Sequence, residues 1–116
     1  MDFPNPMVTS TGPERGETDV VYDPVIHADF SRTMDPGSMS AASFYLTKSD
    51  GTPVPATRKY QTDKLAWYLY PVKPLEPGVT YLVTITTEAR AENGVALVAP
   101  VTWSFTTVFF SDVSLD

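Results

Sequence analysis

The sequence predicts an all-β fold, a seven-stranded Greek-key β-sandwich, and three observations support this prediction. Eleven prolines are spread along the 116 residues, which argues against long helices. The segments between the prolines are short, and most of them alternate apolar with polar residues, as half-buried strands do. The turn Pro77-Gly78 is followed by Tyr81 at the head of an alternating strand, which is typical of the corner of such a sandwich.

The N-terminal half contains two predicted strands and one turn. Residues 7–11 form a candidate edge strand, which Gly12-Pro13 ends. Residues 25–30 form the second strand, in which every other side chain is apolar. Asp35-Pro36-Gly37-Ser38 has the composition of a turn and favours a single helical turn that runs through Met39.

Five further strands follow, and each is separated from the next by turn residues. Residues 44–48 end at Ser49-Asp50-Gly51-Thr52, which predicts a hairpin turn. The remaining predicted strands are residues 54–61, 65–70, 79–88 and 101–107, with a turn at Asn93-Gly94 before the last one. Seven strands at this spacing fit a sandwich of about 100 residues.

Period-two alternation predicts which side chains face the core. They are Ile26, Ala28, Phe30, Phe44, Leu46, Leu65, Trp67, Leu69, Tyr81, Val83, Ile85, Trp103 and Phe105. The corner is predicted to consist of Leu75, Pro77, Gly78 and Tyr81, with the Tyr81 hydroxyl bonded to upstream backbone. A true immunoglobulin domain has its second cysteine two residues beyond this tyrosine, where this chain has Val83, and the chain contains no cysteine. We therefore expect an Ig-like sandwich without a disulfide. Burial of large side chains at about 2 kcal/mol each offsets the missing ~2–4 kcal/mol of a cross-link.

The net charge and the hydropathy of the chain exclude two classes of partner, nucleic acid and the membrane interior. Fourteen acidic and eight basic residues give a net charge of −6 without a basic cluster, so nucleic acid is not an expected partner. No apolar run approaches the ~18 residues of a membrane span, and we expect no membrane insertion of this domain. The N-terminus lacks the layout of a signal peptide. If the protein is secreted, we expect this chain to be an excised piece with a start Met added.

Several short motifs follow one another in a fixed order along the chain. They are Pro13-x-x-Gly16-x-x-x-Val20, Phe30-Ser31-x-x-Met34-Asp35-Pro36, Phe44-Tyr45-Leu46-Thr47, Asp50-Gly51-Thr52-Pro53-Val54-Pro55, Leu75-x-Pro77-Gly78-x-x-Tyr81 and Trp103-Ser104-Phe105-Thr106-Thr107. In this order and spacing, the chain resembles the bacterial Ig-like domain of the SbsA surface-layer type, the Big_5 family. The family often has an Asp-x-x-Gly-Asn turn before its last strand, where this chain reads Ala91-Glu92-Asn93-Gly94. Any acidic role of that turn is therefore not carried over.

The resemblance implies a non-catalytic module of secreted or cell-surface bacterial proteins, commonly repeated or placed beside other domains. We expect residues 1–5 to be an N-terminal extension and residues 6–107 to be the domain. Residues 108–116 are expected to be a C-terminal linker or the start of a next domain, with Phe109 and Phe110 packed at that junction.

Catalysis is not supported by the residue inventory, and we predict that the protein is not an enzyme and has no cofactor. His27 is the only histidine, and a Ser-His-Asp triad would have to use it from the outward face of a strand beside Asp29. An exposed His and Asp on a sheet surface is the favoured interpretation. One imidazole cannot make a His-rich zinc site. A paired-carboxylate hydrolase stays formally open, but no acidic residue lies in a context that suggests burial.

Calcium is the metal that deserves a test, because loop carboxylates are its natural ligands. The candidate ligands are Asp29, Asp35, Asp50, Asp63, Glu88 and Glu92. None of them lies in a D-x-[DN]-x-[DN]-G loop. We therefore predict no metal site and leave weak calcium binding open.

Exposed tyrosines are the candidate ligand contacts. Tyr68 and Tyr70 alternate with inward residues and should face outward, where they could stack on a sugar or contact a partner protein. Cross-strand packing with Thr57 and Lys59 is the favoured alternative, and Tyr45 is placed similarly. The sequence thus predicts an extracellular or cell-surface spacer or interaction module, with the periplasm left open. Its expected partners are neighbouring domains, cell-wall glycan or another protein. The alternative function is a ligand-binding module for glycan or protein adhesion.

Overall fold

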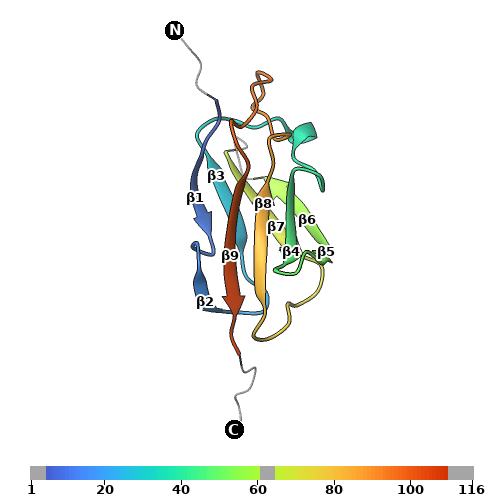
Figure 1. Ribbon diagram of the computed structural model, residues 1–116. Helices are drawn as coiled ribbons and strands as arrows, with labels where there is room; N and C mark the ends of the chain where they lie inside the picture. The colour runs from blue at the N-terminus through green and yellow to red at the C-terminus, as the bar shows by residue number, and fades with distance from the viewer. Residues whose placement is uncertain (1–4, 61–64, 110–116) are drawn as a thin grey trace.

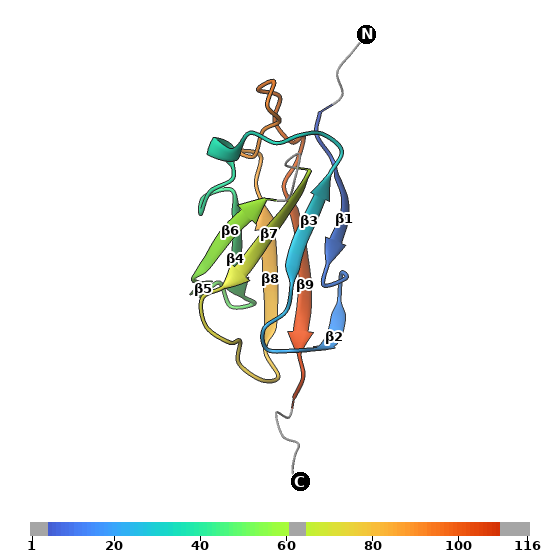
Figure 2. The same cartoon turned by 180° about the vertical axis from the view of Figure 1, so that it is seen from behind.

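The computed structural model describes residues 5–60 and 65–109, which form two β-sheets packed face to face (Figures 1 and 2). The four-stranded sheet has the order β1 (Val8–Gly12), β3 (Ile26–Phe30), β7 (Ala66–Pro71), β6 (Ala56–Tyr60). The five-stranded sheet has the order β2 (Glu17–Val20), β9 (Val101–Thr107), β8 (Thr80–Ile85), β4 (Phe44–Lys48), β5 (Pro53–Val54). The predicted all-β, Ig-like sandwich is therefore confirmed.

Most predicted strand limits agree with the structure. The limits of β4 and β9 are those predicted, and β1, β3 and β7 differ by a single residue at one or both ends. Neighbouring strands are antiparallel except for β2 and β9, which run parallel. Alternation located β3, β4, β7 and β9 well because each buries one face against the opposite sheet.

The described residues contain nine strands where the sequence predicts seven. β2 was missed because Glu17-Thr18-Asp19-Val20 has a single apolar residue and hence no alternation. It forms through pairing at the sheet edge, with Glu17 and Val20 opposite Phe105 and Thr107 of β9. A strand that is defined by its neighbour leaves little trace in its own sequence.

The predicted strand over residues 54–61 is wrong as a single element. It divides at Pro55 into β5, where Val54 pairs with Leu46 in one sheet, and β6, where Ala56 pairs with Pro71 in the other. Proline has no N–H to donate, so a ladder is readily interrupted there and the chain crosses between the sheets. The strand predicted over residues 79–88 also ends early, at Ile85, because Thr86 begins a turn that the Ala89 N–H closes.

The core contains every predicted inward side chain except Leu65, which is 39% exposed. Leu65 directly precedes β7, and its carbonyl accepts from the Phe30 N–H at 2.7 Å, while its side chain stays partly exposed. The core also includes residues that alternation did not predict, most of them from loops: Val20, Met34, Met39, Leu75, Ala89 and Leu97.

The turn between β7 and β8 is organised by Tyr81. The Tyr81 ring is 1% exposed, and its hydroxyl accepts a hydrogen bond from the Glu76 backbone N–H at 2.8 Å. Leu75 is buried beside this bond, and Gly78 adopts a φ of +67°, which favours glycine. Thr107 of β9 is also bonded here, because its hydroxyl accepts from the Val79 N–H at 3.0 Å. The turn is thereby tied to the last strand.

Two further turns match their predicted turn chemistry. A 3-10 helix spans Pro36–Ser38, and the Asp35 carboxylate before it accepts from the Gly37 N–H at 3.1 Å. In the turn between β4 and β5, the Asp50 carboxylate accepts from the Thr52 N–H at 2.9 Å. No helix in residues 5–60 and 65–109 is long and apolar enough to cross a membrane.

Candidate functional site

The outer face of the four-stranded sheet carries a row of aromatic side chains, which we name the aromatic row: His27, Tyr68 and Tyr70. His27 of β3 lies directly opposite Tyr68 of β7, and the two ring centroids are 5.6 Å apart. Tyr68 and Tyr70 lie 6.1 Å apart with ring planes only 9° from parallel. The two tyrosines predicted to face outward therefore do lie side by side.

The aromatic row is closely packed on its own sheet. Tyr68 is paired with Lys59 and Tyr70 with Thr57 of β6, the cross-strand neighbours expected from the sequence. Tyr68 is half-buried, whereas Tyr70 remains 39% exposed. Cross-strand packing accounts for the partial burial of the Tyr68 ring. Tyr70 supplies the exposed ring surface of the aromatic row.

His27 and Asp29 belong to a short polar network at one end of the row. The His27 Nδ1 lies 3.2 Å from the Asp29 Oδ1, and the Ser10 hydroxyl donates to the Asp29 Oδ2 at 2.9 Å. The carboxylate stands between serine and histidine, so the Ser10 hydroxyl is bonded to the carboxylate and not to the imidazole. This order differs from that of a nucleophilic triad, in which histidine contacts the serine.

The far edge of the His27 ring is covered by β1. A Cβ added to Gly12 would lie 2.5 Å from His27 Nε2 and 2.7 Å from Cδ2. The imidazole therefore occupies the space that a side chain at position 12 would need. This contact holds the ring between Gly12 and Tyr68.

The candidate calcium ligands are dispersed among separate structural roles. The carboxylates of Asp35 and Asp50 accept from nearby backbone N–H groups, and Asp29 belongs to the histidine network. The hydrogen bond from the Thr52 backbone N–H is the main cause that lowers the pKa of Asp50. Asp63 lies outside the described residues. Within the part of the chain that the structure describes, no three His, Cys, Asp or Glu residues form a group that could hold a metal ion.

Tyr45 lies apart from the aromatic row, on β4 in the other sheet, opposite Thr84. It lines a groove of about 490 Å³ at the side where β5 and β6 diverge, together with Pro55, Arg58 and Val72. The Arg58 Nε donates to the Phe44 carbonyl across this opening at 2.6 Å, and burial lowers the pKa of Arg58. The structure therefore brings together two of the three candidate tyrosines, and Tyr45 belongs to a different surface.

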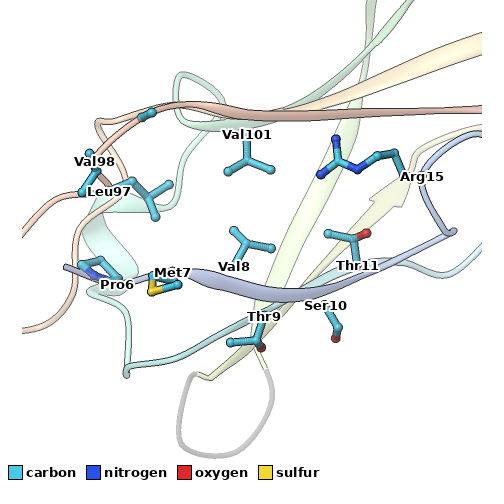
Figure 3. Close-up of a pocket in the computed structure, with 11 residues that line it drawn as sticks. Pro6, Met7, Val8, Thr9, Ser10, Thr11, Arg15, Leu97, Val98 and Val101 are labelled. Atoms are coloured by element: carbon cyan, nitrogen blue, oxygen red, sulfur yellow. The ribbon is translucent and has the colours of Figure 1, made fainter. Parts of the chain in front are cut away.

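Sequence reasoning missed a groove of about 440 Å³ between β1 and the chain that leads into β9. Figure 3 shows Val8 and Val101 pointing toward one another across it, with Leu97 at one end and Arg15 at the other. The Arg15 guanidinium donates to the Thr102 carbonyl at 3.0 Å. The only signal in the sequence was the apolar run over residues 97–99, which had no strand assigned to it.

The model of the family described as "Bacterial Ig-like domain", Big_5, matches residues 2–107. The chain belongs to the Big_5 family. The resemblance that the sequence motifs indicated is thereby confirmed, and a Big_5 domain without a disulfide agrees with the cysteine-free core. No curated protein matches the sequence.

Solved structures with a similar fold come from diverse proteins. Domains 1–6 of the surface layer protein SbsC align with a TM-score of 0.66 and 17% identity, over 90% of this chain and 14% of that one. PcoC, a methionine-rich copper resistance protein from Escherichia coli, aligns with a TM-score of 0.71 and 22% identity, over 90% of this chain and 99% of that one. Native alpha-2-macroglobulin of E. coli aligns at 0.67 and 17%, over 90% of this chain and 6% of that one. At these identities the likeness shows the fold of the Big_5 domain alone.

Proposed function

We propose that this Big_5 domain is a non-catalytic module of a larger bacterial surface or secreted protein, in which it spaces or joins neighbouring domains. One observation carries the proposal. The described chain enters before β1 at one end of the sandwich and leaves after β9 at the opposite end (Figures 1 and 2). Modules with entry and exit at opposite ends can be joined in a line, so that each adds its own length to the whole.

The similar structures support a modular role. The chain spans 14% of the SbsC structure and 6% of the E. coli alpha-2-macroglobulin structure. Domains of this fold therefore occur as single units within much longer chains. The surface-layer context of SbsC supports an extracellular or cell-surface location, with a periplasmic one as the alternative.

A domain exchange in the parent protein tests the spacer role. An unrelated Ig-like domain of similar length should replace this module without loss of the parent's function, whereas deletion should shorten the parent as measured by small-angle X-ray scattering. Antibodies against the module should detect it on intact cells, in the culture medium or in the periplasmic fraction. Loss of function on exchange, or detection of the module in the cytoplasmic fraction alone, would contradict the proposal.

A second candidate function, adhesion to a glycan or a protein, is favoured by the aromatic row. Tyr70 is 39% exposed and its ring runs nearly parallel to that of Tyr68, so it offers an open aromatic surface. Binding on a glycan or protein array that Tyr70→Ala abolishes would support adhesion. A uniformly silent array favours the spacer.

Our proposal does not extend to copper, although PcoC is a copper resistance protein. The thioethers of Met34 and Met39 are buried in the core, 0% and 6% exposed. They stabilise the sandwich by packing, which leaves Met7 as the exposed methionine among the described residues.

A further inference from the structure

The outer edge of β9 has no partner strand over its first half, as far as the described residues go. β2 is the described strand that lies along this edge, and its pairs with β9 begin at Phe105. The groove of about 440 Å³ noted above adjoins the stretch before that point. β1 lines the other side of the groove, but it belongs to the four-stranded sheet, where it pairs with β3. One edge of the five-stranded sheet is therefore open at the groove.

The backbone of Thr102 faces this open edge. The Thr107 N–H donates to the Val79 carbonyl, which lies on the β8 side of β9. On the other side, the Ser104 carbonyl accepts from the Gly16 N–H at 2.7 Å. Backbone groups of successive residues in a strand point to opposite sides, so Thr102 points the same way as Ser104. The N–H and the carbonyl of Thr102 are thus directed to the place where a further strand would bond.

The Arg15 side chain makes one of the bonds that a further strand would make. Its guanidinium donates to the Thr102 carbonyl at 3.0 Å. At the opposite edge of the sheet, the Arg58 Nε donates to the Phe44 carbonyl at 2.6 Å in the same manner. Arg58 is half-buried and donates also to the Ala56 carbonyl at 3.0 Å, so it closes its edge firmly. Arg15 is exposed, and its bond can be exchanged for one from a peptide.

The groove accepts apolar side chains in alternation. Val8 and Val101 point toward one another across it, and Leu97 lies at one end (Figure 3). Side chains in a strand alternate between two faces, so every second residue of a strand added at β9 would point between Val8 and Val101. Arg15, at the other end, is the charged residue of the lining. A carboxylate is the group that complements it.

We propose that this groove, together with the edge of β9 at Thr102, is the docking site for an extended segment of a partner protein, which adds to the five-stranded sheet as a further strand. The segment has apolar residues at alternate positions and a carboxylate at the Arg15 end. Its backbone N–H takes over the bond to the Thr102 carbonyl, and the Arg15 guanidinium is released to pair with the carboxylate. In such strand addition, main-chain bonds supply affinity and the alternate side chains supply specificity.

The shape of the site favours an extended segment over a second copy of this chain. The open stretch of the edge, residues 101–104, provides roughly 13 Å of strand. β2 occupies the edge beyond it, and β1 forms a wall on the other side of the groove. Two folded domains need about 800 Å² of contact on each side for a stable complex, which this short stretch does not offer. A single strand enters the groove without that requirement.

The test begins with peptides selected from a random decapeptide library on phage, with this chain as the bait. We expect the selected sequences to share apolar residues at alternate positions and one acidic residue. A bound peptide should slow hydrogen exchange of the Thr102 amide by about tenfold or more, because this N–H enters a ladder. The chain without peptide gives the reference rate.

Thr102→Pro and Thr102→Val form a matched pair of variants. Both remove the threonine hydroxyl, but proline also removes the N–H that faces the groove, and an edge strand tolerates proline at such a position. Thr102→Pro should weaken binding of the selected peptide by about tenfold, as for one hydrogen bond lost. Thr102→Val should bind the peptide as the wild type does. Equal melting temperatures of the two variants would show that the sandwich stays folded, and otherwise the exchange rate in the wild type decides.

The carboxylate is tested by a double-mutant cycle. The acidic residue of the selected peptide is replaced by its amide, which should weaken binding to the wild type by about two- to fivefold. The same replacement should have no effect on binding to Arg15→Met. Equal effects in both backgrounds would overturn the pairing of the carboxylate with Arg15.

Three other results would overturn the docking inference: selection of no peptide, equal binding to Thr102→Pro and Thr102→Val, or an unchanged exchange rate of the Thr102 amide. Dimerisation of this chain that Thr102→Pro abolishes would assign the edge to a second copy and overturn the inference as well. The inference goes beyond the spacer role, and each of these failures leaves that role standing, because the domain exchange in the parent protein tests it separately.

Discussion

The Tyr81 hydroxyl accepts a hydrogen bond from the Glu76 backbone N–H at 2.8 Å, across the turn at Pro77-Gly78. The Tyr81 ring packs on Phe105 with a centroid separation of 5.7 Å. One side chain thus joins the turn before β8 to the core beneath β9. Because the chain leaves the sandwich beside this turn, the same contact also supports the exit end.

Tyr81→Phe should destabilise the domain by about 1–2 kcal/mol, because the Glu76 N–H loses its acceptor in a partly buried place. The ring and its packing are kept, so the loss reports the hydroxyl alone. Chemical denaturation measures it, with Tyr70→Phe on the outer face as the surface control. A loss within error for Tyr81→Phe would show that the hydroxyl does not stabilise the corner.

Gly12→Ala should destabilise the domain by about 1–3 kcal/mol, because the new Cβ would meet the His27 ring at 2.5 Å. The ring would have to leave its contacts with Tyr68 and Asp29. In a His27→Ala background the same substitution should cost much less, since the obstructing ring is gone. Equal losses in both backgrounds, measured as a double-mutant cycle, would refute this explanation.

Asp50 should titrate below its ordinary pKa of 3.8, chiefly because the Thr52 backbone N–H bonds its carboxylate. A carboxyl group whose pKa is lower in the folded state than in the unfolded state stabilises the folded protein. This stabilisation is complete above the unfolded-state pKa and disappears as the pH falls through the folded-state pKa. NMR titration of the Asp50 carboxyl measures the shift. The stability difference between wild type and Asp50→Asn should shrink over the same acidic range, and a difference independent of pH would contradict the assignment.

Deletion of residues 109–116 should leave the melting temperature of the isolated module nearly intact. Val108 and its hydrogen bonds are retained, and Phe109, the described residue among those deleted, is 69% exposed and contributes little buried surface. Differential scanning calorimetry of the shortened chain measures the effect. A loss of several degrees would mean that the removed residues cover the core of this domain and that its boundary lies later in the chain. Phe110, which the sequence also places at the junction, lies outside the described residues.

Calcium should leave the melting temperature almost unchanged. The carboxylates of Asp35 and Asp50 are engaged by backbone N–H groups, and Asp29 is bonded to Ser10, so binding would have to break existing hydrogen bonds. Thermal unfolding at increasing calcium, with magnesium as the control, tests this. A rise of many degrees in the melting temperature at micromolar to millimolar calcium would show that the loop carboxylates are calcium ligands.

The sequence by itself determined the fold class, most strand limits and the outward orientation of Tyr68 and Tyr70. Each of these follows from local rules. Side chains in a strand alternate between two faces, and the face that is buried must be apolar. Turn residues such as Asp50 bond their own backbone, so their role is independent of distant partners.

Only the tertiary structure decided the features that depend on pairing between distant segments. β2 exists because β9 offers it an edge, and Leu65 is 39% exposed although alternation predicts it to face inward. The groove beside Val101 joins β1 to residues that are many positions away in the chain. The physical reason is that burial and strand pairing are properties of the assembled sandwich, and the local pattern of a segment does not specify which neighbour will cover it.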